Sequence, residues 1–195
     1  MVKVMKDTTS YLRWRDIRRV IDTFEEPRDR LLFRVCAYSG RRISEVLSLR
    51  VKDINPTDRE ILWHILKKRK EYLVSLPIDS GTLNKLEEFI ALGSLTESDY
   101  IFTSCYDKEK PLSRQRAWQI FTKACRESGI KTVGQGEPYI HMLRHSAAIH
   151  DLENNVDVRF IKKKLQHESL DTVSIYLDIS NKDMKEETER VYADE

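Results

Sequence analysis

The chain has few of the residues that mark disulfide-bonded, metal-binding or linker-rich proteins. Only three cysteines occur among its 195 residues, Cys36, Cys105 and Cys125, and none belongs to a Cys-x-x-Cys pattern. This spacing favours neither a disulfide framework nor a thiolate metal site, and reduced intracellular thiols are the simplest interpretation. No Pro/Gly/Ser-rich linker, internal repeat or low-complexity segment divides the chain, so we expect one domain.

The sequence also lacks a long hydrophobic run and a strong charge of one sign. No apolar stretch approaches the roughly 18 to 20 residues of a membrane span, and the N-terminus lacks the apolar segment of a signal peptide. We therefore expect a cytoplasmic protein with no membrane partner. The 34 Lys and Arg residues nearly balance the 32 Asp and Glu residues, and the net charge of +2 does not by itself indicate nucleic acid.

Basic residues are nevertheless grouped along the chain. If the fold gathers these groups on one face, they can follow the backbone of a DNA duplex. For any single group, a solvated helix face balanced by neighbouring acids is the simpler interpretation. The groups are Arg13, Arg15, Arg18 and Arg19, then residues 67–70, then Arg114 and Arg116, then residues 162–164.

Hydrophobic periodicity and capping residues predict a mainly α-helical fold. Two β-prone runs, 61–66 and 72–77, flank the basic residues 67–71 and predict an antiparallel hairpin with a basic tip. A short extended piece is expected at 100–103. The expected helices are 10–23 with Ser10 as its cap, 28–38 ending near Gly40, a short one opened by Arg42, 82–92 ended by Gly93, 113–127, 142–154 with a left-handed stop at Asn154-Asn155, 157–165 capped by Asp157, and 170–178 capped by Ser169.

Tyr176 stands in a set of residues suited to attack on phosphorus. It follows His167 by nine positions, and the run His-Met-Leu-Arg-His at 141–145 precedes both. A free phenol has a pKa of about 10 and is a poor nucleophile at neutral pH. It must therefore lose its proton and meet a phosphate whose negative charge has been neutralised. Arginine does this best, because its planar guanidinium stays charged and grips two phosphate oxygens. A tyrosine alone is more often a core or boundary residue.

Arg144 is one candidate for the phosphate-binding arginine. His141 lies three residues earlier, on the same face of the predicted helix, where it can hydrogen bond beside the same phosphate, and His167 can add a further donor. His141 and His145 are four residues apart, which also suits a zinc pair. No helical Glu of a metalloprotease motif and no cysteine cluster accompanies them, so we expect no metal.

Two segments together resemble the catalytic domain of the tyrosine recombinases, or phage-type integrases, over most of residues 10–180. In that family a Gly-x-Arg-Ile-Ser-Glu-x-x-x-Leu segment carries the first arginine, which corresponds to Arg42 in Gly-Arg-Arg-Ile-Ser-Glu at 40–45. A His-x-Leu-Arg-His segment carries the second, which corresponds to Arg144. The Leu-Gly-His of the family, with a tyrosine nine residues later, is similar to Leu-Gln-His at 165–167 followed by Tyr176.

The resemblance implies a mainly α fold with a small antiparallel hairpin or sheet, and catalytic roles for Arg42, His141, Arg144 and His167 around the nucleophile Tyr176. It also implies a lysine at the hairpin turn that protonates the departing 5′ oxygen. Counting from the first strand selects Lys68, with Lys67 and Lys70 as rivals, whereas counting back from Pro77 selects Arg69. Further DNA contacts are expected from Arg41, Lys67, Arg69, Lys70, Arg114 and Arg116.

The implied activity is site-specific DNA recombination through a covalent 3′-phosphotyrosyl intermediate, with no cofactor. The implied partners are double-stranded DNA and further copies of this chain assembled on it. Two alternatives remain: a type IB topoisomerase-like enzyme that nicks and religates one strand, and a catalytically silent DNA-binding relative. Glu45, one turn after Arg42, either orients that guanidinium or forms an ordinary surface pair.

Residues 1–180 are expected to form a single catalytic domain. About nine residues precede the part that resembles the family, which begins near residue 10, so we expect the separate N-terminal, core-binding domain of the family to be absent. Residues 181–195 form a highly charged tail, with Met184, Val191 and Tyr192 as its few apolar residues. By resemblance this tail docks on a neighbouring subunit, and a disordered tail is the alternative.

Overall fold

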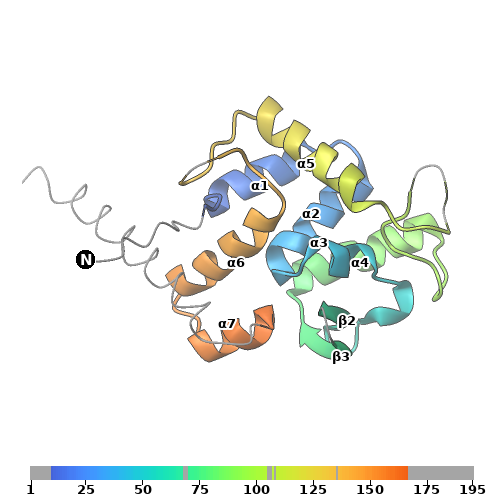
Figure 1. Ribbon diagram of the computed structural model, residues 1–195. Coiled ribbons are helices and arrows are strands. Elements are labelled where there is room, and N and C mark those ends of the chain that lie inside the picture. Colours follow the sequence, from blue (N-terminus) through green and yellow to red (C-terminus); the bar gives the residue numbers. More distant parts are fainter. Residues whose placement is uncertain (1–9, 68–69, 105–106, 108, 135, 167–195) are drawn as a thin grey trace, which may run out of the picture.

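The described part of the chain is a helical domain with one small sheet (Figure 1). This computed structural model describes residues 10–166, except 68–69, 105–106, 108 and 135. The predicted fold class, mainly α with a small antiparallel sheet, is confirmed. In chain order the elements are α1 (Trp14–Thr23), α2 (Pro27–Ser39), α3 (Ile43–Leu47), the short 3-10 helix η1 (Val51–Asp53), β1 (Ile54–Asn55), β2 (Glu60–Lys67), β3 (Lys70–Pro77), α4 (Ser80–Gly93), α5 (Arg114–Glu127), α6 (His141–Glu153) and α7 (Val158–Leu165).

Helix α2 lies at the centre of the domain, in contact with α1, α4 and α6. Its apolar residues point in nearly every direction, which is the pattern of a helix surrounded by protein. Leu32, Phe33, Val35 and Ala37 are completely buried. The sequence predicts a helix at 28–38, and the structure confirms it.

The three strands form an antiparallel sheet in the order β1-β2-β3. The predicted hairpin is confirmed, and its strands extend slightly beyond the predicted runs, so that Lys67 pairs with Lys70. Side chains alternate across a strand, and Ile61, Trp63 and Ile65 of β2 are buried in the core as a result. One face of the hairpin is therefore fixed to the helices, which also fixes the register.

The first helix begins later than the sequence predicts. Ser10 is not its cap, because α1 starts at Trp14. Tyr11 instead exchanges two backbone hydrogen bonds with Val133, at 3.1 and 2.8 Å, and the Leu12 N–H donates to Ser146 Oγ of α6 at 2.8 Å. These contacts hold residues 11–12 in extended backbone, so they cannot join the helix.

Several helix ends match the prediction, and two details differ. Asp157 caps α7 by accepting a hydrogen bond from the Arg159 N–H, and Asn155 adopts a left-handed φ of 58°. Helix α4, by contrast, includes Gly93 and is followed by Ser94 as its C-cap, and residues 100–103 make only isolated β-bridges. The helix predicted at 170–178, with its Ser169 cap, lies outside the described residues. Among the helices described, none is both long and apolar enough to cross a membrane.

Gly40 ends α2 at a position where a side chain has no room. Its φ is 65°, and a Cβ added there would lie 2.6 Å from Leu165 Cδ2 of α7. Two constraints therefore act together, a left-handed backbone that disfavours other residues and close contact between two helices. At Gly129 the φ is 62°, but a Cβ added there would meet open space, with nothing within 4 Å among the described residues beyond its chain neighbours. Only the first constraint applies at Gly129.

We expect Gly40→Ala to destabilise the protein substantially more than Gly129→Ala. The left-handed backbone costs about 1–2 kcal/mol in either variant, and the steric overlap adds about 1–3 kcal/mol at residue 40 alone. Urea unfolding of the two variants and the unmodified protein measures the difference. Equal losses of stability would show that α7 moves away from Gly40 without cost.

Candidate active site

The structure gathers three of the predicted catalytic residues, Arg42, His141 and Arg144, at the point where α3, α6 and the end of α2 meet. Arg42 immediately precedes α3, and His141 and Arg144 lie in the first turn of α6. The other three predicted residues, Lys68, His167 and Tyr176, lie outside the described residues, as does Arg69. The described part of the candidate site therefore consists of two arginines and a histidine.

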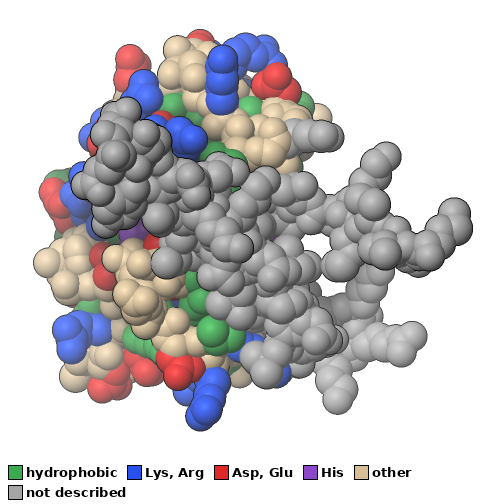
Figure 2. Space-filling model, turned by 90° about the vertical axis from the view of Figure 1, so that its left-hand side faces the viewer, with side chains coloured by type: hydrophobic (Ala, Val, Ile, Leu, Met, Phe, Trp, Pro, Cys, Tyr) green, Lys and Arg blue, Asp and Glu red, His purple; other side chains and the backbone are tan. Residues whose placement is uncertain are grey.

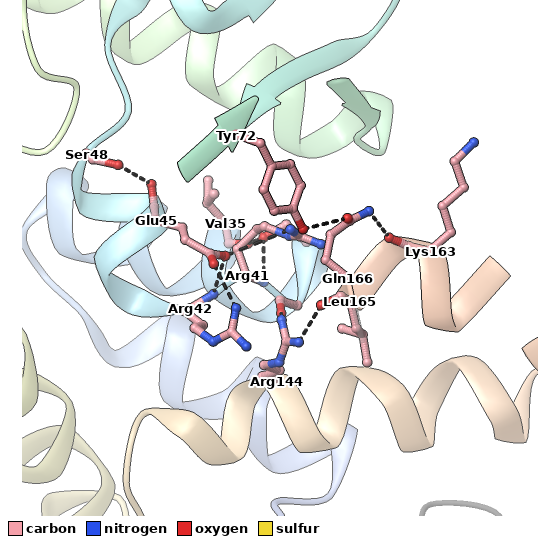
Figure 3. A network of polar contacts seen from close by, with 12 residues as sticks. Val35, Arg41, Arg42, Glu45, Ser48, Tyr72, Arg144, Lys163, Leu165 and Gln166 are labelled. Atoms are coloured by element: carbon pink, nitrogen blue, oxygen red, sulfur yellow. Dashed lines mark hydrogen bonds and ion pairs between the residues drawn. The ribbon is translucent and has the colours of Figure 1, made fainter. Parts of the chain in front are cut away.

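Arg42 is held in place by the buried carboxylate of Glu45. Glu45 Oε2 accepts a hydrogen bond from the Arg42 backbone N–H at 3.1 Å, and Oε1 accepts one from Arg42 Nη1 at 2.9 Å (Figure 3). Glu45 is only 1% exposed, so the alternative of an ordinary surface pair is wrong. The Arg42 side chain keeps 37% of its surface exposed. A buried acid thus orients an arginine that solvent can still reach.

Arg41 points the other way, into the interior. It is 2% exposed, its guanidinium lies 5.7 Å from the ring centroid of Trp63 on β2, and Nη1 is 3.9 Å from Glu45 Oε2. None of its side-chain nitrogens has a hydrogen-bond partner in the described part of the structure. Burial lowers the pKa of Arg41 to about 10, against the opposing effect of Glu45. This place does not fit the predicted DNA contact, because the guanidinium is packed beneath the sheet.

Arg144 joins three separate parts of the chain. Its Nη1 donates to the Gly40 carbonyl at 2.8 Å, and its Nη2 donates to the Leu165 carbonyl at 2.5 Å (Figure 3). These bonds fasten α6 to the end of α2 and to the end of α7. The side chain is buried, since Arg144 is 2% exposed. In this structure both terminal nitrogens of Arg144 are therefore committed to backbone carbonyls.

His141 and His145 of α6 lie beside these arginines, with their ring centroids 4.7 Å apart in an edge-to-face arrangement. Desolvation lowers the pKa of His141, and the positive charges of Arg144 and Arg42 lower it further. Because both arginines act on one imidazole, all three side chains belong to one electrostatic cluster. In the described ranges, no group of three or more His, Cys, Asp or Glu side chains is placed to hold a metal ion.

At the end of α7, two residues that the sequence analysis did not select connect the hairpin to the candidate site. Gln166 ends α7 with a left-handed φ of 54°. Its Oε1 accepts a hydrogen bond from the Tyr72 hydroxyl of β3 at 3.1 Å, and its Nε2 donates to the Lys163 carbonyl at 2.6 Å (Figure 3). In the sequence, the one signal for this contact was Gln166 itself, which stands where the family motif has glycine.

The remaining predicted DNA contacts lie on two elements. Arg114 and Arg116 are exposed in the first turn of α5, and Lys67 and Lys70 end the two hairpin strands. Figure 2 shows Lys and Arg side chains interspersed with Asp and Glu over the described part of one face. On the part of this face that is described, Lys and Arg side chains thus do not form a surface of one sign.

We expect stability to fall as the pH drops from about 6.5 to about 4, in part because of His145. Burial and the charges of His141 and Arg144 lower its pKa from 6.5 to about 4. Between these values the unfolded chain binds a proton that the folded protein excludes, so acid favours unfolding. In His145→Gln the loss of unfolding free energy between about pH 7 and about pH 5 should be smaller, as measured by urea titration at each pH. Identical losses would contradict the lowered pKa.

Curated relatives match nearly the whole chain. The chain is 30% identical over 191 residues to the tyrosine recombinase XerA of Pyrococcus furiosus, covering 96% of this chain and 64% of that protein. It is 29% identical over 198 residues to transposase A of transposon Tn554 from Staphylococcus aureus, covering 95% of this chain and 53% of the transposase. The chain therefore spans less than two thirds of the length of these relatives.

Solved structures show the same fold. A crystal structure of XerA recombinase superposes with a TM-score of 0.73 at 23% identity, covering 96% of this chain and 65% of that one. The XerH recombinase in a post-cleavage complex with its difH substrate gives a TM-score of 0.74 at 23% identity, covering 94% of this chain and 53% of that one.

The sequence profile of the phage integrase family matches residues 10–183, which is most of the chain. This range includes every segment on which the predicted catalytic residues lie, from Gly40 to Tyr176. The chain belongs to the phage integrase family, the tyrosine recombinases.

Proposed function

We propose that the chain cuts and rejoins DNA at specific sites through a covalent 3′-phosphotyrosyl intermediate. The observation that carries the proposal is the cluster of Arg42, Arg144 and His141. Two guanidinium groups and a neutral imidazole in one place suit a phosphodiester whose equatorial oxygens gain charge in the transition state. Family membership and the names of the relatives support the same activity, since these are recombinases and a transposase.

In the proposed reaction the Tyr176 oxygen, after losing its proton, attacks the phosphorus of one DNA strand. A bond forms between this oxygen and phosphorus while the bond to the 5′ oxygen breaks, and Lys68 gives that oxygen the proton it needs. Because the phosphotyrosyl bond replaces one ester by another, a free 5′ hydroxyl can reverse the step without ATP. Attack by a strand from a second duplex completes recombination.

The arginines have distinct proposed roles in this step. Arg42, held at both backbone and side chain by Glu45, presents a pre-oriented guanidinium to a nonbridging oxygen. Arg144 is bound to the carbonyls of Gly40 and Leu165, so a phosphate would have to add to or replace these contacts. His141 and His167 are proposed to hydrogen bond to the phosphate oxygens in the pentacoordinate transition state of this attack.

The proposed partner is duplex DNA, bound by several copies of the chain. The solved relatives include the XerH complex with its DNA substrate, and a lambda integrase dimer bound to a core site. Arg114 and Arg116 of α5 and the basic hairpin tip are proposed phosphate contacts, because they are cationic. We propose that residues 181–195 dock on a neighbouring copy and that the protein acts in the cytoplasm.

The central prediction concerns Tyr176. On a nicked duplex whose short product strand diffuses away, the unmodified protein should accumulate a covalent DNA adduct that survives denaturing electrophoresis. Tyr176→Phe should lower adduct formation by at least about a thousandfold, because the nucleophile is lost. Tyr192→Phe is the matched control and should form adduct normally.

Three outcomes would redirect the proposal. If the unmodified protein forms no adduct, the enzyme assignment is wrong and a silent DNA-binding relative is favoured. If Tyr192→Phe loses the adduct and Tyr176→Phe does not, the nucleophile is wrong. If the protein relaxes supercoiled DNA but exchanges no strands between two duplexes, the topoisomerase-like alternative is favoured.

A second prediction separates the hairpin lysines. Lys68→Ala should slow cleavage of ordinary DNA by about 10²–10⁴-fold, as expected for loss of a general acid. A substrate with sulfur in place of the bridging 5′ oxygen should restore the rate, because a thiolate leaves without a proton. Lys67→Ala and Lys70→Ala are the controls, and any loss in them should persist with the sulfur substrate. Rescue of Lys67→Ala or Lys70→Ala instead would reassign the general acid.

A further inference from the structure

The backbone at Gln166 is in a conformation that costs energy. Its φ of 54° is in the left-handed region, where a side chain crowds the following carbonyl and glycine is the usual residue at a helix end. The family motif has glycine at this position. Backbone strain of this kind persists where the surrounding structure holds the residue in place, and it is concentrated at functional sites.

The side chain of Gln166 joins two elements that flank the candidate site. Its amide oxygen receives the hydroxyl hydrogen bond of Tyr72, on β3, while its amide nitrogen donates back to the Lys163 carbonyl of α7. A glutamine that is fixed at both ends of its amide group has little rotational freedom left. Figure 3 shows Tyr72 reaching down from the hairpin to meet Gln166 at the end of α7.

A second set of contacts also holds the end of α7 in place. Arg144 donates to the carbonyl of Leu165, the residue before Gln166, and Leu165 packs so closely on Gly40 that a methyl group there would overlap it. The end of α7 is thus held on one side by Arg144 and Gly40 and on the other by Tyr72. The next residue in the chain is His167, and Tyr72 lies two residues from Lys70 in the sequence.

We propose that Tyr72 and Gln166 form a clamp, the Tyr72–Gln166 clamp, that positions His167 relative to the hairpin tip. The inference rests on the proposed function, in which His167 and a hairpin lysine act on the same phosphodiester. In the proposed reaction the clamp acts directly on neither the DNA nor the reacting atoms. Tyr72 and Gln166 are therefore positioning residues, which set the distance between two catalytic parts that belong to different elements.

Single-turnover cleavage at saturating DNA tests the clamp. Tyr72→Phe removes only the hydroxyl, and Gln166→Gly removes the acceptor and relieves the backbone. Each should slow cleavage by about 2- to 12-fold, the effect of one hydrogen bond, while the dissociation constant for DNA changes less than about twofold. The double variant should be no slower than the slower single variant, because both changes break the same contact.

Stability measurements separate positioning from simple structural support. Gln166→Gly should leave the unfolding midpoint within about 2–4 °C of that of the unmodified protein even as it slows cleavage, because relief of the left-handed strain offsets the loss of its side-chain hydrogen bonds. Ser94→Gly is the matched control: Ser94 ends α4 with a φ of 49°, and this variant should gain stability without slowing cleavage. Tyr139→Phe, at an exposed tyrosine, controls for loss of a hydroxyl.

The outcomes distinguish this inference from the proposed function. If the unmodified protein forms a Tyr176-dependent adduct and both clamp variants cleave at its rate, the clamp is wrong and the function stands. Effects that multiply in the double variant would also overturn the clamp, because the two residues would then act independently. If the unmodified protein forms no adduct, the proposed function fails, and the positioning role fails with it.

Discussion

The candidate site depends on the two hydrogen bonds that Arg144 makes to backbone carbonyls. One carbonyl belongs to Gly40 and the other to Leu165, so a single guanidinium from α6 fastens the ends of two other helices. Helix ends leave carbonyl groups without intrahelical partners, and a buried cation satisfies them well. Arg42 follows Gly40 by two residues, and Gln166 follows Leu165 directly. The positions of Arg42 and of the α7 corner therefore both trace back to this contact.

Much of this arrangement could be predicted because it is encoded locally. Gly40 signals the end of α2, Arg42 opens the next helix, and the β-prone runs on either side of 67–71 define the hairpin. What could not be predicted depends on partners far away in the chain. Ser10 looks like a helix cap, yet the Tyr11 backbone pairs with Val133, and nothing local reports that pairing.

The two neighbouring arginines show the same limit. Arg41 and Arg42 are identical residues side by side, and sequence reasoning treated both as able to face DNA. The structure places Arg41 against Trp63 and keeps Arg42 partly exposed, because α3 begins between the core and solvent and successive residues point to opposite sides. Which arginine faces inward was decided by the position of the sheet, which no local pattern specifies. The family motif alone distinguished them.

Charge at this corner is not balanced within the residues labelled in Figure 3. The guanidinium groups of Arg41, Arg42 and Arg144 lie with the carboxylate of Glu45, and these four side chains together carry two positive charges in excess. Burial of Arg41 and Arg144 makes water a poor screen for that repulsion. The fold therefore stores unfavourable electrostatic energy at this place. An anion that binds here would release part of it, so that folding and anion binding are thermodynamically linked.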